Sequence, residues 1–126
     1  MWLKSLLPCA IIALSSANAS AYCKGVVSVT SAVLEEHTLA ISVRVFAGRP
    51  DIARTVYYDL TGDARVQTSF SPNTSTGTIH GSFSTRVESG DEYADDEVEI
   101  ENGIFGERIM SSPRIKQVMV TACLEQ

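Results

Sequence analysis

Apolar side chains recur at every second residue along most of this 126-residue chain. In the segment HTLAISVRVF, for example, Leu39, Ile41 and Val43 alternate with polar or small neighbours. Successive side chains of a β-strand point to opposite faces of a sheet, so a period of two describes a strand with one buried and one wet face. The same period occurs in DIARTVYYDL and GTIHGSFSTRV, and no segment has a convincing helical period. The sequence therefore predicts an all-β fold of antiparallel strands.

Turn-forming residues fall between the apolar runs, as a meander of short strands requires. Seven or eight strands with this spacing are typical of an immunoglobulin-like antiparallel β-sandwich, which is the fold we expect. The first and last segments, residues 23–34 and 114–124, are apolar at both parities, so we expect them to be buried on both sides or paired centrally. The strongest turn signal is Asn102-Gly103, which predicts a hairpin that joins DEVEIE to IFGERIM.

The N-terminal segment has the order of a secretory signal peptide. A short basic start with Lys4 leads into the apolar run LLPCAIIAL and then into the small-residue stretch SSANASA. Cleavage after Ala19 or Ala21 satisfies the small-x-small rule, and we favour Ala21. We thus expect a signal peptide over residues 1–21 and a single β-sandwich domain over residues 22–126. The mature protein would be secreted, or periplasmic in a bacterium, without membrane insertion.

Processing would leave two of the three cysteines in the mature chain, because Cys9 lies in the predicted signal peptide. In an oxidising compartment the expected outcome is one disulfide between Cys23 and Cys123, and the alternative is two free thiols. The bridge would close the sandwich by joining its two terminal strands.

The acidic net charge argues against nucleic acid as a partner. The chain has 10 basic and 15 acidic residues, and loss of Lys4 with the signal peptide would change the net charge from −5 to −6. Attraction to nucleic acid requires clustered Lys and Arg, so we expect no nucleic-acid partner. A basic or neutral protein partner remains compatible with this charge.

A search for catalytic motifs finds no nucleophile elbow, Walker loop, zinc-protease helix or Cys-x-x-Cys pair. The two histidines, His37 and His80, lie on different predicted strands, and no base stands beside a candidate nucleophile. We therefore expect a protein that is not an enzyme and that uses no cofactor or metal.

Residues 88–103 carry eight carboxylates and no basic side chain. We considered a solvated face, a surface for a basic partner and a calcium loop, in that order of preference. Strand alternation would place Asp96, Val98 and Ile100 on one face and the intervening glutamates on the other. The candidate partner-binding carboxylates are Asp91, Glu92, Asp95, Asp96, Glu97, Glu99 and Glu101.

Two further features are candidates for binding. One member of the pair Tyr57 and Tyr58 must face away from the core, and the alternation favours Tyr57 as the exposed aromatic. Residues 69–84 are poor in charge and rich in Ser, Thr and Gly, so they are either a mobile loop or an edge strand that pairs with another chain.

The signal peptide, Cys23, Cys123 and the segment TSTGTIHGSFSTRVESGDE together resemble the small periplasmic immunoglobulin-like proteins of curli assembly. Those proteins act as chaperone-like inhibitors of amyloid fibre subunits. The resemblance implies a non-enzymatic, protein-binding assembly factor whose partner is a secreted fibre subunit. An alternative is an inhibitor of a secreted basic enzyme, such as a lysozyme, that uses the acidic hairpin. A small secreted hydrolase is the third choice.

Overall fold

The computed structural model describes residues 23–68 and 70–125, so the predicted signal peptide and its cleavage site lie outside the described residues. The described chain is all-β, as the alternation predicted. It forms seven strands: β1 (Gly25–Glu35), β2 (Thr38–Ala47), β3 (Arg54–Gln67), β4 (Thr74–Val87), β5 (Tyr93–Ile100), β6 (Arg108–Ile109) and β7 (Arg114–Glu125).

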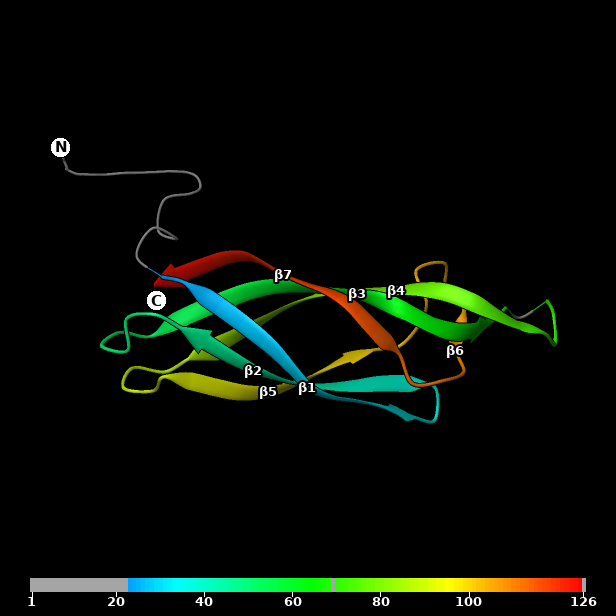
Figure 1. Ribbon diagram of the computed structural model, residues 1–126, viewed down its shortest axis with the longest axis horizontal. Coiled ribbons are helices and arrows are strands. Elements are labelled where there is room, and N and C mark those ends of the chain that lie inside the picture. Colours follow the sequence, from blue (N-terminus) through cyan, green and yellow to red (C-terminus); the bar gives the residue numbers. More distant parts are fainter. Residues whose placement is uncertain (1–22, 69, 126) are drawn as a thin grey trace.

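The strands form two antiparallel sheets that pack face to face as a sandwich (Figure 1). One sheet has three strands in the order β1-β2-β5. The other has four, with β4 on one side of the central strand β3 and both β6 and β7 on its other side. The β3–β4 hairpin is long and reaches past the β1–β2 turn at one end of the molecule (Figure 1).

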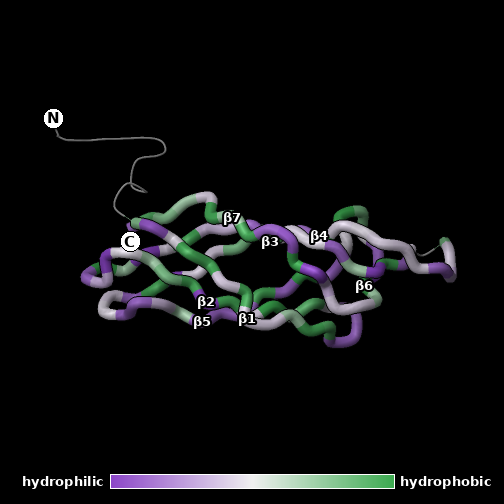
Figure 2. Tube along the Cα trace, in the orientation of Figure 1, coloured by the Kyte–Doolittle hydropathy of each residue, from purple (hydrophilic) through white to green (hydrophobic). Residues whose placement is uncertain are grey.

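The core lies between the two sheets and comes from the residues that share one parity. In β2, Leu39, Ile41 and Val45 have no exposed surface, and in β3 the same is true of Val56 and Leu60. Colouring by hydropathy makes the alternation along these strands visible (Figure 2). Burying a side chain of this size stabilises the fold by about 1.5–3 kcal/mol, so the period of two is the main source of stability.

The predicted disulfide is present. Cys23 precedes β1 of the three-stranded sheet, Cys123 lies in β7 of the other sheet, and their Cα atoms are 5.5 Å apart across a sequence separation of 100 residues. Both cysteines are 2% exposed. The bridge therefore joins the two sheets at the end of the sandwich where β1 begins and β7 ends (Figure 1).

A buried arginine closes the same end. The side chain of Arg54, the first residue of β3, has no exposed surface. Its guanidinium donates to the backbone carbonyls of Ala47 at the end of β2 and of Gly48 just after it, and to those of Glu88 and Asp91 in the β4–β5 connection. Four carbonyls that would otherwise need water are satisfied by one side chain, which ties two turns to the core.

The expectation that both terminal segments are buried on both sides is wrong. β1 and β7 are edge strands of a two-layer sandwich, and the outer face of each is wet: Val26, Val33 and Met119 are 57%, 50% and 47% exposed. Small and β-branched side chains suit a half-exposed edge as well as a buried centre, and so the composition did not distinguish the two. The pairing of β1 with β2 also contains a register shift between Val29 and Ser31.

The predicted hairpin at Asn102-Gly103 is also wrong. β5 pairs with β2, and the returning segment crosses to the other sheet, where β6 pairs with β3. Only a single bridge, between Asn102 and Arg108, remains of the expected ladder. The physical reason is burial: Ile109 loses all its exposed surface against β3, which a hairpin strand beside the edge of β5 would not achieve.

The mobile loop proposed for residues 69–84 is wrong for most of that segment, because β4 begins at Thr74. β4 pairs with β3 along its whole length and has no second partner strand, so the alternative of an edge strand describes it better. Part of its open edge is covered, since the amide of Ile104 donates to the carbonyl of Thr78 at 3.0 Å.

Candidate functional site

The acidic segment lies on β5, and its exposed carboxylates form a row. Glu97 and Glu99 point to the outer face of the three-stranded sheet, opposite Ser42 and Ala40 of β2. Val98 and Ile100 point inward and are 9% and 5% exposed, as the alternation predicted. The remaining predicted carboxylates outside β5, namely Asp91, Glu92 and Glu101, are exposed in its flanking turns.

Asp96 is separated from this row because it faces inward. Its Oδ2 accepts a hydrogen bond of 2.8 Å from the hydroxyl of Thr85 in β4, and that hydroxyl is also 2.8 Å from the hydroxyl of Tyr58 in β3. Burial raises the pKa of Tyr58 above its ordinary value of 10. Asp96 therefore links the two sheets through a polar contact and is only partly accessible to a partner.

Next to the acidic row lies a cluster of aromatic and charged side chains. Arg44 of β2 donates two hydrogen bonds to Asp95, at 2.8 and 3.1 Å, and lies 4.2 Å from the ring centroid of Tyr93. The Tyr93 ring in turn packs against Phe46, with centroids 5.6 Å apart. Because Val26 of β1 pairs with Phe46, the exposed apolar surface continues across three strands. We call Val26, Arg44, Phe46, Tyr93 and Asp95 the aromatic cluster.

The electrostatics of the aromatic cluster are those of an exposed ion pair. The Arg44 guanidinium holds the pKa of the Asp95 carboxyl below its usual range, mainly through their hydrogen bonds. Both side chains are well exposed, so the pair adds little to stability and serves mainly to hold Arg44 against the ring of Tyr93. Sequence reasoning missed Tyr93, Arg44 and Val26, because only the register of β5 on β2 brings them together.

Tyr57 is exposed as predicted, but on the opposite side of the molecule. It lies on the outer face of the four-stranded sheet, where its neighbour in β7 is Ala122. The structure therefore does not bring Tyr57 together with the acidic row. Two exposed aromatics of similar accessibility, Tyr57 at 40% and Tyr93 at 41%, mark different outer faces.

The histidines give no arrangement of nucleophile and base. The Nε2 of His80 lies 3.9 Å from Asp59, and Ser82 donates to the same carboxylate at 2.8 Å, so the serine is bonded to the acid and not to the histidine. A serine nucleophile requires the reverse order, with the imidazole next to the hydroxyl. The Nδ1 of His37 lies 3.0 Å from the carbonyl of Ile109, which can only accept, so this nitrogen carries the hydrogen.

Within residues 23–68 and 70–125, no group of three or more His, Cys, Asp and Glu side chains is arranged to hold a metal ion. The calcium alternative therefore has no set of convergent oxygens in this part of the chain, because Asp95, Glu97 and Glu99 lie in a row along the outer face of β5 and do not converge on one point. The described residues also include no helix with the length and apolar character needed to cross a membrane.

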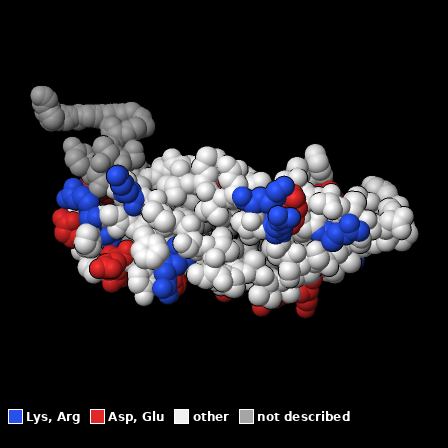
Figure 3. All heavy atoms as spheres, in the orientation of Figure 1, with Lys and Arg blue, Asp and Glu red and all other residues white. Residues whose placement is uncertain are grey.

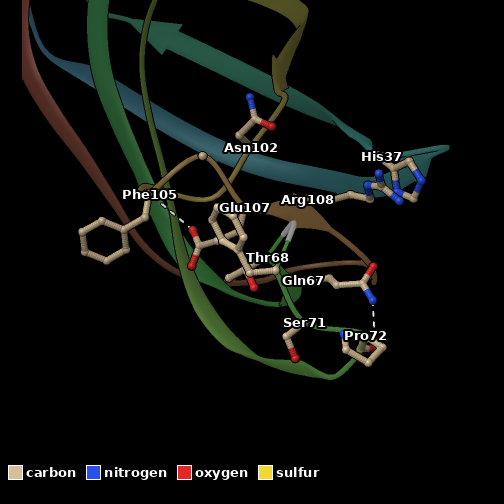
Figure 4. A pocket seen from close by; sticks show the side chains of 11 residues that line it. His37, Gln67, Thr68, Ser71, Pro72, Asn102, Phe105, Glu107 and Arg108 are labelled. Carbon is tan, nitrogen blue, oxygen red and sulfur yellow. Dashed lines mark hydrogen bonds between the residues drawn. The ribbon is translucent and has the colours of Figure 1, made fainter.

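A hollow of about 1000 Å³ opens at the end of the sandwich opposite the disulfide (Figure 4). It is lined by residues from the β1–β2 turn, the β3–β4 connection and the β5–β6 connection, which include His37, Phe70, Pro72, Phe105 and Arg108. The hydrophobic colouring of the β5–β6 connection makes it stand out from the other loops in Figure 2. The sequence alone did not single out this site, because Phe70 fell in a predicted loop and Phe105 in the returning strand of the predicted hairpin.

Charged side chains are unevenly distributed over the face drawn in Figure 3. They gather at the disulfide end and over the first part of β7, and the surface between them is largely uncharged. The β7 group includes the pair Lys116 and Asp63, whose charged atoms are 3.2 Å apart. The disulfide end includes Arg49, which bonds to both Asp51 and Glu125 at 3.3 Å.

Comparison with known proteins adds no relative. The chain matches no protein-family model, no curated protein and no solved structure.

Proposed function

We propose that this chain is a secreted, non-enzymatic protein-binding domain, periplasmic in a bacterium, that keeps a fibre-forming subunit of the curli type from polymerising. The observation that carries the proposal is the aromatic cluster beside the acidic row on one sheet face. Exposed aromatic and arginine side chains are the residues that anchor protein interfaces. This surface lies on β1, β2 and β5, the three strands of one sheet, and within the described residues β5 pairs with β2 alone.

The proposed mechanism is transient capping of an aggregation-prone strand. A client strand that meets the aromatic cluster would bury Phe46 and Tyr93, while Glu97 and Glu99 would attract basic side chains of that client. The acidic row also disfavours the addition of further strands with like charge, so growth would stop at the contact. Neither step needs a cofactor or turnover.

We further propose that the sandwich is of the immunoglobulin-like type. The order β1-β2-β5 corresponds to the order of strands A, B and E in an immunoglobulin sheet, and β4 beside β3 corresponds to C′ beside C in a variable-type domain. The pairing of β3 with β7 matches the pairing of strand C with strand F. Binding at a sheet face is a common use of such sandwiches, which agrees with the proposed surface.

The test is the lag time of fibre formation by a secreted, β-rich subunit in the presence of substoichiometric protein. We expect the wild-type protein to lengthen the lag and Tyr93→Ser to lose most of this effect. Tyr57→Ser is the matched control, because Tyr57 is equally exposed on the opposite sheet face. An unchanged lag with the wild-type protein would reject the proposal, and an equal loss in both variants would reject the assigned surface.

A second function, inhibition of a secreted basic enzyme such as a lysozyme, is favoured by the exposed glutamates of β5. Because the segment is a flat strand and not a projecting hairpin, it would cover a cationic cleft and not insert into one. Binding of such an enzyme should weaken with salt and be lost when Glu97, Glu99 and Glu101 become Gln. Binding that does not respond to either change would exclude this function.

A further inference from the structure

We infer that the hollow at the end opposite the disulfide is a second binding site, for a peptide segment that carries a large apolar side chain next to a carboxylate. The inference is independent of the proposed function, because its residues are separate from the aromatic cluster and from the acidic row. It rests on the exposure, the unpaired charge and the rigidity of the loops that line the hollow.

Exposure of apolar side chains is concentrated here. Phe70 is 96% exposed and Phe105 is 85% exposed, more than any other large hydrophobic residue in the described chain. Both line the same hollow although they are on different loops. Two phenylalanines in water beside a concavity of ligand size point to burial by an apolar group from outside.

One ionisable group of the hollow, Arg108, is free to bind an anion. Glu107 also lines the hollow, and its Oε1 accepts a hydrogen bond of 3.1 Å from the amide of Phe105. The guanidinium of Arg108 makes no hydrogen bond or ion pair with any other residue that the structure describes, whereas Arg44 and Arg86 each pair with a carboxylate. Arg108 lines the same hollow as Phe70 and Phe105. An unpaired guanidinium in such a hollow is suited to a carboxylate that follows or precedes an apolar side chain.

Hydrogen bonds among the described residues hold parts of both loops in place before any ligand binds. Arg108 belongs to β6 and is paired with Gln67 of β3, whose side-chain amide donates to the carbonyl of Pro72 at 2.8 Å. The other loop is closed by a hydrogen bond of 2.9 Å from the amide of Gly103 to the carbonyl of Glu107. Because a pre-ordered loop loses less conformational entropy on binding than a flexible one, this order should favour binding.

The shape favours a peptide over a small molecule. The hollow is open to solvent, so it cannot enclose a whole ligand. It can accept one or two side chains from a segment that continues along the surface. A carboxylate beside the apolar side chain would meet Arg108 at the rim, where Figure 4 shows its side chain beside His37.

The experiment is a titration of the disulfide-bonded mature protein with blocked tetrapeptides, followed by amide chemical shifts in NMR spectra. The probes are acetyl-Gly-Phe-Asp-Gly-amide and the same peptide with Asn in place of Asp. We expect shifts at residues 102–108 and about fivefold tighter binding of the Asp peptide, which corresponds to an exposed charge contact of about 1 kcal/mol. Phe105→Ser should abolish these shifts, and Arg108→Gln should remove the preference for Asp.

Tyr93→Ser is the control, because it removes an exposed aromatic from the other surface and should leave peptide binding unchanged. Equal affinity for both peptides, shifts confined to other residues, or no shift at millimolar peptide would overturn the inference. Shifts of residues 102–108 that depend on protein concentration without peptide would also overturn it, since the hollow would then bind a second copy. The fibre assay separates the two sites. If Phe105→Ser still lengthens the lag time and Tyr93→Ser does not, the hollow and the aromatic cluster act independently.

Discussion

The two ends of the sandwich use opposite means to terminate their strands. At the disulfide end, polar groups turn inward: Arg54 is fully buried and its guanidinium serves carbonyls of two turns, beside the bridge from Cys23 to Cys123. At the other end, apolar groups turn outward, as Phe70 and Phe105 do. At the disulfide end, the buried guanidinium satisfies backbone carbonyls of the protein itself. At the open end, exposed apolar surface is left for a binding partner to bury.

This difference indicates that stability and binding are separated along the long axis of the molecule. A buried side chain that makes many contacts cannot be changed without a cost to folding, whereas an exposed loop residue is free to serve recognition. Substitutions at the disulfide end should therefore lower the free energy of unfolding, and those at the open end should not. The predictions below test this separation, from the largest expected effect to the smallest.

The largest effect is expected from loss of the disulfide. Replacement of both Cys23 and Cys123 by Ser should lower the free energy of unfolding by about 4 kcal/mol, because the bridge closes a loop of roughly 100 residues in the unfolded chain. Urea unfolding followed by circular dichroism measures this. A loss below about 1 kcal/mol would show that the bridge does not constrain the unfolded chain in the expected way.

Arg54→Met should lower the free energy of unfolding by about 3 kcal/mol, because it leaves one buried carbonyl, that of Ala47, and three partly buried carbonyls without their donor. Arg65→Met is the matched control on the same strand, where the side chain is exposed and bonds mainly to Thr74. We expect the control to change stability by less than about 1 kcal/mol. Similar losses in the two variants would contradict the role of Arg54 at the closed end.

Thr85→Val tests the polar contact that joins the sheets between the two ends. The substitution keeps the shape but leaves the Tyr58 hydroxyl and the Asp96 carboxylate without their shared partner, so we expect a loss of about 1–2 kcal/mol. Thr76→Val, at an exposed site of the same strand, is the control. If Tyr58→Phe together with Thr85→Val recovers most of the stability, the loss comes from the orphaned hydroxyl.

The smallest effect is expected at the open end. Phe105→Ala should change the free energy of unfolding by no more than about 0.5 kcal/mol, because the side chain is 85% exposed. Phe83→Ala, which removes a ring that packs against the core, should cost about 3 kcal/mol. Thermal unfolding of the two variants compares them directly. A large loss in Phe105→Ala would mean that the loop supports the fold and is not free for binding.

The parts of the fold that the sequence predicted are those decided by local alternation. The faces of β2, β3 and β4 follow from their period of two, and the bridge between Cys23 and Cys123 was expected from the cysteine count and the predicted compartment. The position of a strand within a sheet depends on pairing between distant segments. For this reason the apolar terminal segments proved to be edges, and Asn102-Gly103 did not form the expected hairpin.

The same distinction applies to the candidate sites. The exposed side of β5 and the exposure of Tyr57 were predictable, since each depends on the parity of one strand. The contact between Tyr93 and Arg44 was not predictable, because the two residues come from distant segments. The same is true of Phe70 and Phe105, which line one hollow. A surface made of several strands or loops becomes visible only when register and connection are known.

The register shift in β1 has a consequence for how copies of this protein meet. β1 is an edge strand whose residues 25–34 carry no charged side chain, a composition that ordinarily permits identical strands to add to one another in succession. The irregularity between Val29 and Ser31, where the Thr30 hydroxyl donates to the carbonyl of Ser42, interrupts the flat ladder near its middle. Because bulges twist an edge away from flat pairing, we expect geometry, and not charge, to oppose self-propagating assembly at this edge.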